Sequence, residues 1–107
     1  MVIHVSGEVD IVAAPTLRHC IDEQLGKVRS LVLDLTGTSF FGAAGLSVLV
    51  HTADRARQHE VSWALICPHA VLRPLTVTGL SEGLPVCVDL PEAIAAVTTE
   101  QAALSGS

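Results

Sequence analysis

Gly42-Ala43-Ala44-Gly45 stands directly before an apolar helical pattern and is the first segment whose residue types suggest chemistry. Free backbone N–H groups at the start of a helix attract anions, so a phosphate could bind there. The segment lacks the glycine spacing of a dinucleotide fingerprint and the Lys-Ser/Thr pair of a P-loop. A structural interpretation explains it more simply, because glycine caps helices and alanine favours them.

Two carboxylates, Glu8 and Asp10, follow the first predicted strand and could form an acid and base pair. Sites in α/β sheets form at strand ends, which favours this interpretation. In the alternative, Asp10 accepts hydrogen bonds from its own backbone in a polar turn. Neither a nucleophile nor a cofactor motif stands beside them, and no Gly-x-Ser-x-Gly elbow occurs. We therefore predict a protein that is not an enzyme and holds no cofactor.

The histidines and cysteines show no metal-binding pattern. No i, i+4 histidine pair and no His-Glu-x-x-His run occurs, so no metal site is predicted. The three cysteines form no Cys-x-x-Cys pair, which argues against a zinc knuckle or a disulfide framework and favours buried, reduced thiols. A redox bridge between Cys67 and Cys87 stays open, because both lie in or at the end of strands that could be neighbours. The residues considered are His4, His19, His51, His59, His69, Cys20, Cys67 and Cys87.

Length and charge narrow the class of protein. A chain of 107 residues, 50% of them hydrophobic, has room for one folded domain with its own core. The formal net charge of −5 has the wrong sign for binding a nucleic-acid backbone. No apolar run approaches the roughly 18 to 20 residues of a membrane helix, and no secretory leader precedes the first strand. We expect a cytoplasmic protein without a membrane span.

Strand and helix patterns alternate along the chain, which predicts an α/β sheet packed against helices. A nearly continuous apolar run at 30–35, closed by Thr36-Gly37, is typical of a central strand covered on both faces. Apolar residues repeat with helical spacing after Gly42. The predicted strands are 2–7, 30–35, 61–67 and 85–89; the predicted helices are 15–25, 43–58, a short turn at 71–77 and a last helix from 91; residues 103–107 are predicted to be a flexible tail.

Several short motifs, in this order, resemble the STAS family and, within it, the bacterial anti-sigma factor antagonists. They are Val5-Ser6-Gly7-Glu8-Val9-Asp10, Ala14-Pro15-x-Leu17, Leu31-Val32-Leu33-Asp34-Leu35-Thr36-Gly37, Phe40, Gly45-Leu46 and Leu80 after Thr78-Gly79. The resemblance covers nearly the whole chain and implies a single STAS domain over residues 1–102. Its fold would be a four- to five-stranded mixed sheet with helices packed on it.

The resemblance also implies a function. Such antagonists bind an anti-sigma factor that is a GHKL-type serine kinase and so relieve the inhibition of a sigma factor. They use the loop before the second helix and the first turns of that helix. On this chain the implied binding residues are Asp10, Phe41, Gly42, Ala43, Ala44, Gly45 and Leu46. A different regulatory protein remains an alternative partner.

The chain departs from the family where the kinase acts. The family loop usually reads Asp-Ser-Ser-Gly or Asp-Ser-Thr-Gly, whereas this chain has Gly42-Ala43-Ala44-Gly45, so the acceptor serine falls on Ala43. Phosphate would add about −1.5 to −2 charge to a contact surface, and the chain lacks the hydroxyl that would carry it. We expect binding that phosphorylation does not control, unless Ser39 or Ser47 replaces the acceptor.

Two further expectations concern partners. Family members usually carry another strand before the one at 2–7, so the sheet is expected to have an uncovered edge. Two interpretations stay open: a homodimer through strands, or a sequence that begins after that strand. As an alternative function, some solitary STAS proteins dock on the ATPase of an ABC transporter. That alternative would use the same fold with a different partner.

Overall fold

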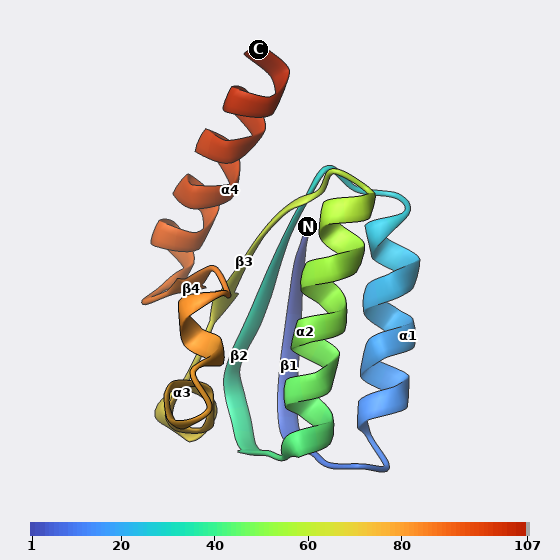
Figure 1. Ribbon diagram of the computed structural model, residues 1–107, viewed down its shortest axis with the longest axis vertical. Coiled ribbons are helices and arrows are strands. Elements are labelled where there is room, and N and C mark those ends of the chain that lie inside the picture. The colour runs from blue at the N-terminus through green and yellow to red at the C-terminus, as the bar shows by residue number, and fades with distance from the viewer. Residues whose placement is uncertain (107) are drawn as a thin grey trace.

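The computed structural model describes the backbone of residues 1–106 and the side chains of residues 1–98. Strands and helices alternate along this part of the chain, so the predicted α/β fold is confirmed (Figure 1). The elements in order are β1 (Val2–Val9), α1 (Ala14–Leu25), β2 (Ser30–Phe41), α2 (Ala43–Gln58), β3 (Ser62–Ile66), α3 (His69–Val77), the 3₁₀ turn η1 (Leu80–Glu82), β4 (Val86–Cys87) and α4 (Leu90–Gly106).

The four strands form one sheet in the order β1-β2-β3-β4. The number of strands agrees with the prediction, but all three pairs are parallel, so the sheet is not mixed. Parallel neighbours need a crossover connection, and each connection here contains at least one helix. β2 and β3 are therefore interior strands, and β1 and β4 are the edges.

Helices cover both faces of the interior strands. The side chains of Leu31, Leu33 and Leu35 in β2 are completely buried and pack in one cluster with α1, α2 and α3. Val32 points to the opposite face, where it packs with Ala93 of α4. Burial on both faces explains why this segment is an almost unbroken apolar run.

β2 is twice as long as predicted. It continues past Thr36-Gly37 to Phe41, because β1 pairs with it along its whole length. Two irregularities in that pairing each place one extra residue in β2. Gly37 is required by close approach, since a Cβ there would lie 3.1 Å from the Cβ of Ser6. In the sequence, Gly37 indicates a turn. In the structure, it lies where β1 and β2 come closest.

The second helix lies where its pattern predicts, over Ala43–Gln58. Val48, Leu49 and Ala56 are buried against the sheet. Its first turn carries no acidic residue, and two arginines stand in its last turn, where the helix dipole is negative. The charges that match the helix dipole and the spacing of the apolar residues therefore favour the same boundaries for α2.

The last strand is shorter than predicted, two residues instead of five. Val88 is 81% exposed, and Asp89 begins the cap of α4. The Asp89 Oδ1 accepts a hydrogen bond from the Glu92 backbone N–H at 2.9 Å. The chain after Cys87 is therefore used to start a helix rather than to extend the sheet.

Helix α4 continues through the segment predicted to be a flexible tail. The backbone of residues 103–106 is helical, and Ser107 lies outside the described residues. The flexibility of this end stays a prediction. Within the described residues, α4 and the other helices are too short or too polar to cross a bilayer.

Replacing Leu33 by Ala should lower the free energy of unfolding by about 2 to 5 kcal/mol, because the completely buried side chain would leave a cavity in the core. Urea denaturation followed by circular dichroism measures this loss. Val77→Ala is the control, since Val77 is 79% exposed and its truncation should stay within about 0.5 kcal/mol. A loss below about 1 kcal/mol for Leu33→Ala would contradict the central position of β2.

Candidate functional site

The start of α2 lies at the end of the sheet where β1 and β2 both finish (Figure 1). Only Gly42 separates β2 from α2, and its backbone N–H donates to the carbonyl oxygen of Val9 at 3.0 Å. The Gly42 carbonyl accepts the first helical bond from Leu46 at 3.1 Å. The two predicted regions, Asp10 and residues 41–46, are thus brought together by backbone bonds.

The predicted residues differ in exposure. Ala43 is exposed, and Gly42, Ala44 and Leu46 are half-buried. Phe41 is buried, as is Gly45 beneath it. A surface contact can therefore reach the two alanines directly, whereas Phe41 and Gly45 would act from below by holding the helix in place.

Phe41 and Gly45 are matched in shape. A Cβ at Gly45 would lie 2.9 Å from two carbons of the Phe41 ring, closer than side-chain atoms pack. The ring therefore lies flat against the helix backbone only because residue 45 has no side chain. This contact fixes how deeply the first turn of α2 is seated on the sheet.

Sequence analysis missed three exposed apolar residues beside this turn. Phe40 is 45% exposed, and its ring lies against Gly42, where a Cβ would be 3.3 Å from Cζ. Ile11 and Val12 are each 80% exposed in the loop between β1 and α1. The signal was present, because two β-branched residues in a short connection have no core position to fill. Phe40 was identified only as part of the STAS motifs, and its exposure was missed because β2 was predicted to end earlier.

Asp10 adopts the structural role that the sequence left as one of two alternatives. Its Oδ1 accepts hydrogen bonds from the backbone N–H of Val12 at 3.1 Å and of Ala13 at 2.9 Å. Its own carbonyl accepts from Ala14 at 2.9 Å. The carboxylate thus holds the loop that presents Ile11 and Val12. Glu8 lies within β1 and is exposed.

A shallow groove of about 300 Å³ runs between α1 and α2 next to this loop. Its lining is apolar except for Arg18 on α1 and Ser47 on α2. Ser47 is exposed, and so is Ser39 on β2, whose hydroxyl donates to the Gly7 carbonyl at 3.4 Å. Of the two hydroxyls left open as acceptors, Ser47 lies on the groove and Ser39 lies on the strand before α2.

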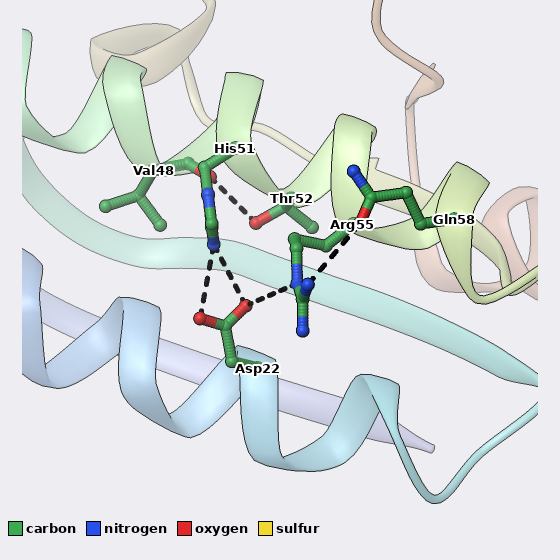
Figure 2. A network of polar contacts seen from close by, with 6 residues as sticks. All are labelled: Asp22, Val48, His51, Thr52, Arg55 and Gln58. Atoms are coloured by element: carbon green, nitrogen blue, oxygen red, sulfur yellow. Dashed lines mark hydrogen bonds and ion pairs between the residues drawn. The ribbon is translucent and has the colours of Figure 1, made fainter.

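A polar cluster further along joins α1 to α2 (Figure 2). His51 Nε2 lies 3.0 and 3.2 Å from the two carboxylate oxygens of Asp22, and Arg55 Nε lies 3.8 Å from the nearer one. The Thr52 hydroxyl donates to the Val48 carbonyl at 2.8 Å. The cluster is an ion pair that joins two helices, and no hydroxyl or thiol among the described side chains is hydrogen-bonded to the imidazole.

The cysteines lie apart from this end of the sheet. Cys67 packs with the cluster under α1, α2 and α3, whereas Cys87 belongs to the cluster under α4, so the two side chains are on opposite faces of the sheet. Burial, with a smaller effect of Cys87, raises the pKa of Cys67 to about 11. Burial, followed by Glu92 and Asp89, also raises the pKa of Cys87. Both thiols are free, and neither environment favours a thiolate.

The described side chains contain no group of three or more His, Cys, Asp or Glu that could hold a metal ion. The end of the sheet instead presents a small apolar surface around the first turn of α2. We call it the α2-start surface and define it by Ile11, Phe40, Ala43, Ala44 and Ser47. Such a surface suits contact with another protein better than catalysis.

Comparison with known proteins agrees with this assessment. The family model of the STAS domain matches residues 1–93. The anti-sigma-F factor antagonist RsfB of Mycobacterium tuberculosis is 29% identical over 98 residues, which are 90% of this chain and 80% of RsfB. The crystal structure of an anti-sigma factor antagonist from Mycobacterium paratuberculosis superposes with a TM-score of 0.83 at 33% identity, over 91% of this chain and 84% of that one.

A more distant structure shares the fold. The anti-sigma factor antagonist SpoIIAA in its unphosphorylated form superposes with a TM-score of 0.67 at 19% identity, over 85% of this chain and 81% of SpoIIAA. At that identity the likeness concerns the fold alone. The sheet and helices of this chain are therefore arranged as in solved anti-sigma factor antagonists, the group that the sequence motifs resemble.

Asp10→Ala should destabilise the protein by about 0.5 to 2 kcal/mol, because two backbone N–H groups lose their acceptor. Asp10→Asn keeps an oxygen at the same place and should retain most of that stability. Thermal and urea unfolding of the two variants measure the difference. Equal stability of Asp10→Ala and the wild type would show that the carboxylate does not hold the loop.

Alkylation should discriminate among the thiols. Cys20 is exposed and should react first with iodoacetamide at pH 8. The pKa of Cys67 is about 11, whereas the ordinary value for a cysteine is 9.0, so at pH 8 Cys67 has about 100-fold less thiolate than an ordinary cysteine. The alkylation rate of Cys67 should therefore keep rising as the pH approaches 11. Mass spectrometry locates the adducts, and protein unfolded in urea is the control in which all three react alike. Faster reaction at Cys67 than at Cys20, or a Cys67–Cys87 disulfide after mild oxidation, would contradict the burial described.

Proposed function

Because the chain belongs to the STAS domain family, we propose that it is an anti-sigma factor antagonist that binds its anti-sigma factor through the α2-start surface. The observation that carries the proposal is the exposed apolar surface around Ala43, at the end of a fold shared with such antagonists. RsfB is named as an antagonist of an anti-sigma-F factor, and we extend that kind of partner to this chain.

The contact would be made by small side chains. Ala43 and Ala44 leave the first turn of α2 nearly flat, and Phe40 and Ile11 stand beside them as larger apolar anchors. Leu46 would contribute its half-buried edge, while Gly42, Phe41 and Gly45 set the position of the turn. Asp10 would contribute by fixing the loop that presents Ile11. Apolar anchors surrounded by polar groups are typical of the energetically important part of an interface.

Binding would be independent of phosphorylation. The resemblance implies a GHKL-type serine kinase as the anti-sigma factor, and the hydroxyl that such a kinase would modify is replaced by the methyl group of Ala43. Without a phosphate, no added charge and no desolvation penalty would separate the partners. The antagonist would then act constitutively, in the cytoplasm where sigma factors work.

Ala43→Glu should weaken binding about tenfold or more, because a carboxylate would be buried in an apolar contact. The free protein should remain folded, since a negative charge at a helix N-terminus is favourable. Isothermal titration calorimetry with GHKL-type anti-sigma factors measures the affinity. Ala70→Glu is the matched control, because Ala70 is an exposed alanine in the first turn of another helix, α3.

Unchanged affinity of Ala43→Glu would refute the assigned surface. The absence of binding between the wild type and every anti-sigma factor tested would refute the function. If a transporter ATPase were recovered with the protein instead, the chain would serve a different partner with the same fold.

Ala43→Ser should restore a phosphorylation site. With an anti-sigma kinase and ATP, the wild type should take up no phosphate in residues 39–47, whereas Ala43→Ser should be modified at residue 43. Phosphate mapping by mass spectrometry gives the site, and Ala44→Ser controls for the effect of any added hydroxyl. Phosphate on Ser39 or Ser47 of the wild type would overturn the claim of constitutive action.

A further inference from the structure

Arg18 is the charged residue of the groove between α1 and α2. It is exposed on the second turn of α1 and lines the groove together with Ala44 and Ser47 of α2. None of the ion pairs among the described side chains includes Arg18. Its guanidinium can therefore bind an anion that a partner brings.

The carboxylate that could pair with Arg18 within α1 is used elsewhere. Asp22 stands four residues after Arg18, a spacing at which opposite charges on a helix can pair, although the order with the cation first is the weaker one. The Asp22 oxygens instead bind α2, with His51 Nε2 at 3.0 and 3.2 Å and Arg55 Nε at 3.8 Å (Figure 2). This contact joins the two helices beyond the groove and leaves the charge of Arg18 to the groove itself.

The helix ends beside the groove add positive charge. α1 and α2 lie side by side and begin at the same end of the sheet, and the N-terminal end of a helix is partly positive (Figure 1). The start of α1 already meets an anion, because the Asp10 carboxylate accepts from the N–H groups of Val12 and Ala13. The first turn of α2 has no acidic residue, and its cap Gly42 has no side chain that could accept a bond. A carboxylate in the groove would therefore meet Arg18 on one wall and the start of α2 on the other.

The remainder of the groove is apolar and small. Its volume of about 300 Å³ is at the lower end of the roughly 300 to 1,000 Å³ of pockets that enclose a small molecule, and the groove is shallow. A side chain of another protein, held in place by the surface around the groove, suits it better than a free small molecule. The apolar lining residues are Ile11, Ala14, Pro15, Ala44 and Val48.

We propose that the groove holds a segment of the anti-sigma factor in which an apolar side chain adjoins a carboxylate, and that the carboxylate pairs with Arg18. This inference rests on the proposed function, because the groove shares Ile11, Ala44 and Ser47 with the α2-start surface. The apolar side chain would pack against the groove lining and lose its contact with water. A guanidinium and a carboxylate can form two parallel hydrogen bonds, which would fix the direction of the bound segment as well as add affinity.

Charge favours this occupant over the alternatives. A basic segment would bring like charges together at Arg18, and an uncharged apolar segment would take water from the guanidinium without replacing it by an acceptor. A second copy of this chain would bring the same net charge of −5, which opposes association. An apolar segment with one carboxylate, supplied by a different protein, satisfies both the lining and Arg18.

Charge variants at Arg18 test the proposal. Arg18→Glu should raise the dissociation constant of the complex with an anti-sigma factor about tenfold or more, whereas Arg18→Met, which retains an apolar stem, should raise it less. Arg73→Glu is the matched control, because Arg73 is exposed on α3 and makes the same change in net charge. Isothermal titration calorimetry measures the constants, and circular dichroism checks that each variant is folded. An effect of Arg18→Glu no larger than that of Arg73→Glu would overturn the proposal.

A charge exchange identifies the carboxylate on the partner. The exposed Asp and Glu residues of the anti-sigma factor are replaced by Arg one at a time, and each variant is titrated with the wild type and with Arg18→Glu. One replacement should improve the affinity for Arg18→Glu about fivefold or more while weakening binding to the wild type, because residues in direct contact are coupled. If no replacement restores affinity, the pairing of Arg18 with a carboxylate is refuted.

Analytical ultracentrifugation of the protein alone tests a second copy as the occupant. Arg18→Glu and the wild type should show the same degree of self-association at every concentration, because the groove is reserved for a different protein. A wild-type dimer that Arg18→Glu dissociates and Arg73→Glu does not would assign the groove to a second copy and would refute the proposed occupant.

The two proposals fail in different ways. If Ala43→Glu weakens binding to the anti-sigma factor and Arg18→Glu does not, the proposed function stands and only the role of the groove is refuted. If Arg18→Glu weakens binding and Ala43→Glu does not, the groove stands and the assignment of the α2-start surface is refuted. If the wild type binds no anti-sigma factor, both proposals are refuted.

Discussion

The hydrogen bond from the Gly42 N–H to the Val9 carbonyl is the constraint on which the site depends. It joins the end of β1 to the start of α2, and only Gly42 separates β2 from that helix. The Phe41 ring then seats against Gly45, and a single methyl group at position 45 would move it. The exposed alanines are therefore carried on a rigid turn, and a rigid contact surface loses little entropy when a partner binds.

The rigid turn explains how binding to an anti-sigma factor could persist in a protein that phosphorylation does not control. Phosphorylation of a hydroxyl at this turn would act by charge and desolvation, not by unfolding the domain. Ala43 carries no hydroxyl that could accept phosphate, and the backbone, the helix N-terminus and the neighbouring Phe40 are in place around it. Under the proposed function, Ala43 would end this regulation and would still keep the surface that a partner recognises.

Much of the fold could be predicted from the sequence, because local patterns carry it. Helix α2 has the predicted bounds since its apolar residues recur with helical spacing and no stronger signal competes. The length of β2 could not be predicted, because Gly37 is needed for contact with Ser6 some thirty residues earlier. That error hid the exposure of Phe40, which follows from the alternation of side chains along the strand. The direction of the strands was also beyond local patterns, so an all-parallel sheet was expected to be mixed.

Backbone amide shifts during titration test the central claim most directly. When an anti-sigma factor is added to ¹⁵N-labelled protein, the largest changes should fall on Ala43, Ala44 and the loop of Ile11 and Val12, with α4 unaffected in its described part. Largest changes on α4 or η1, with the first turn of α2 unperturbed, would contradict the account.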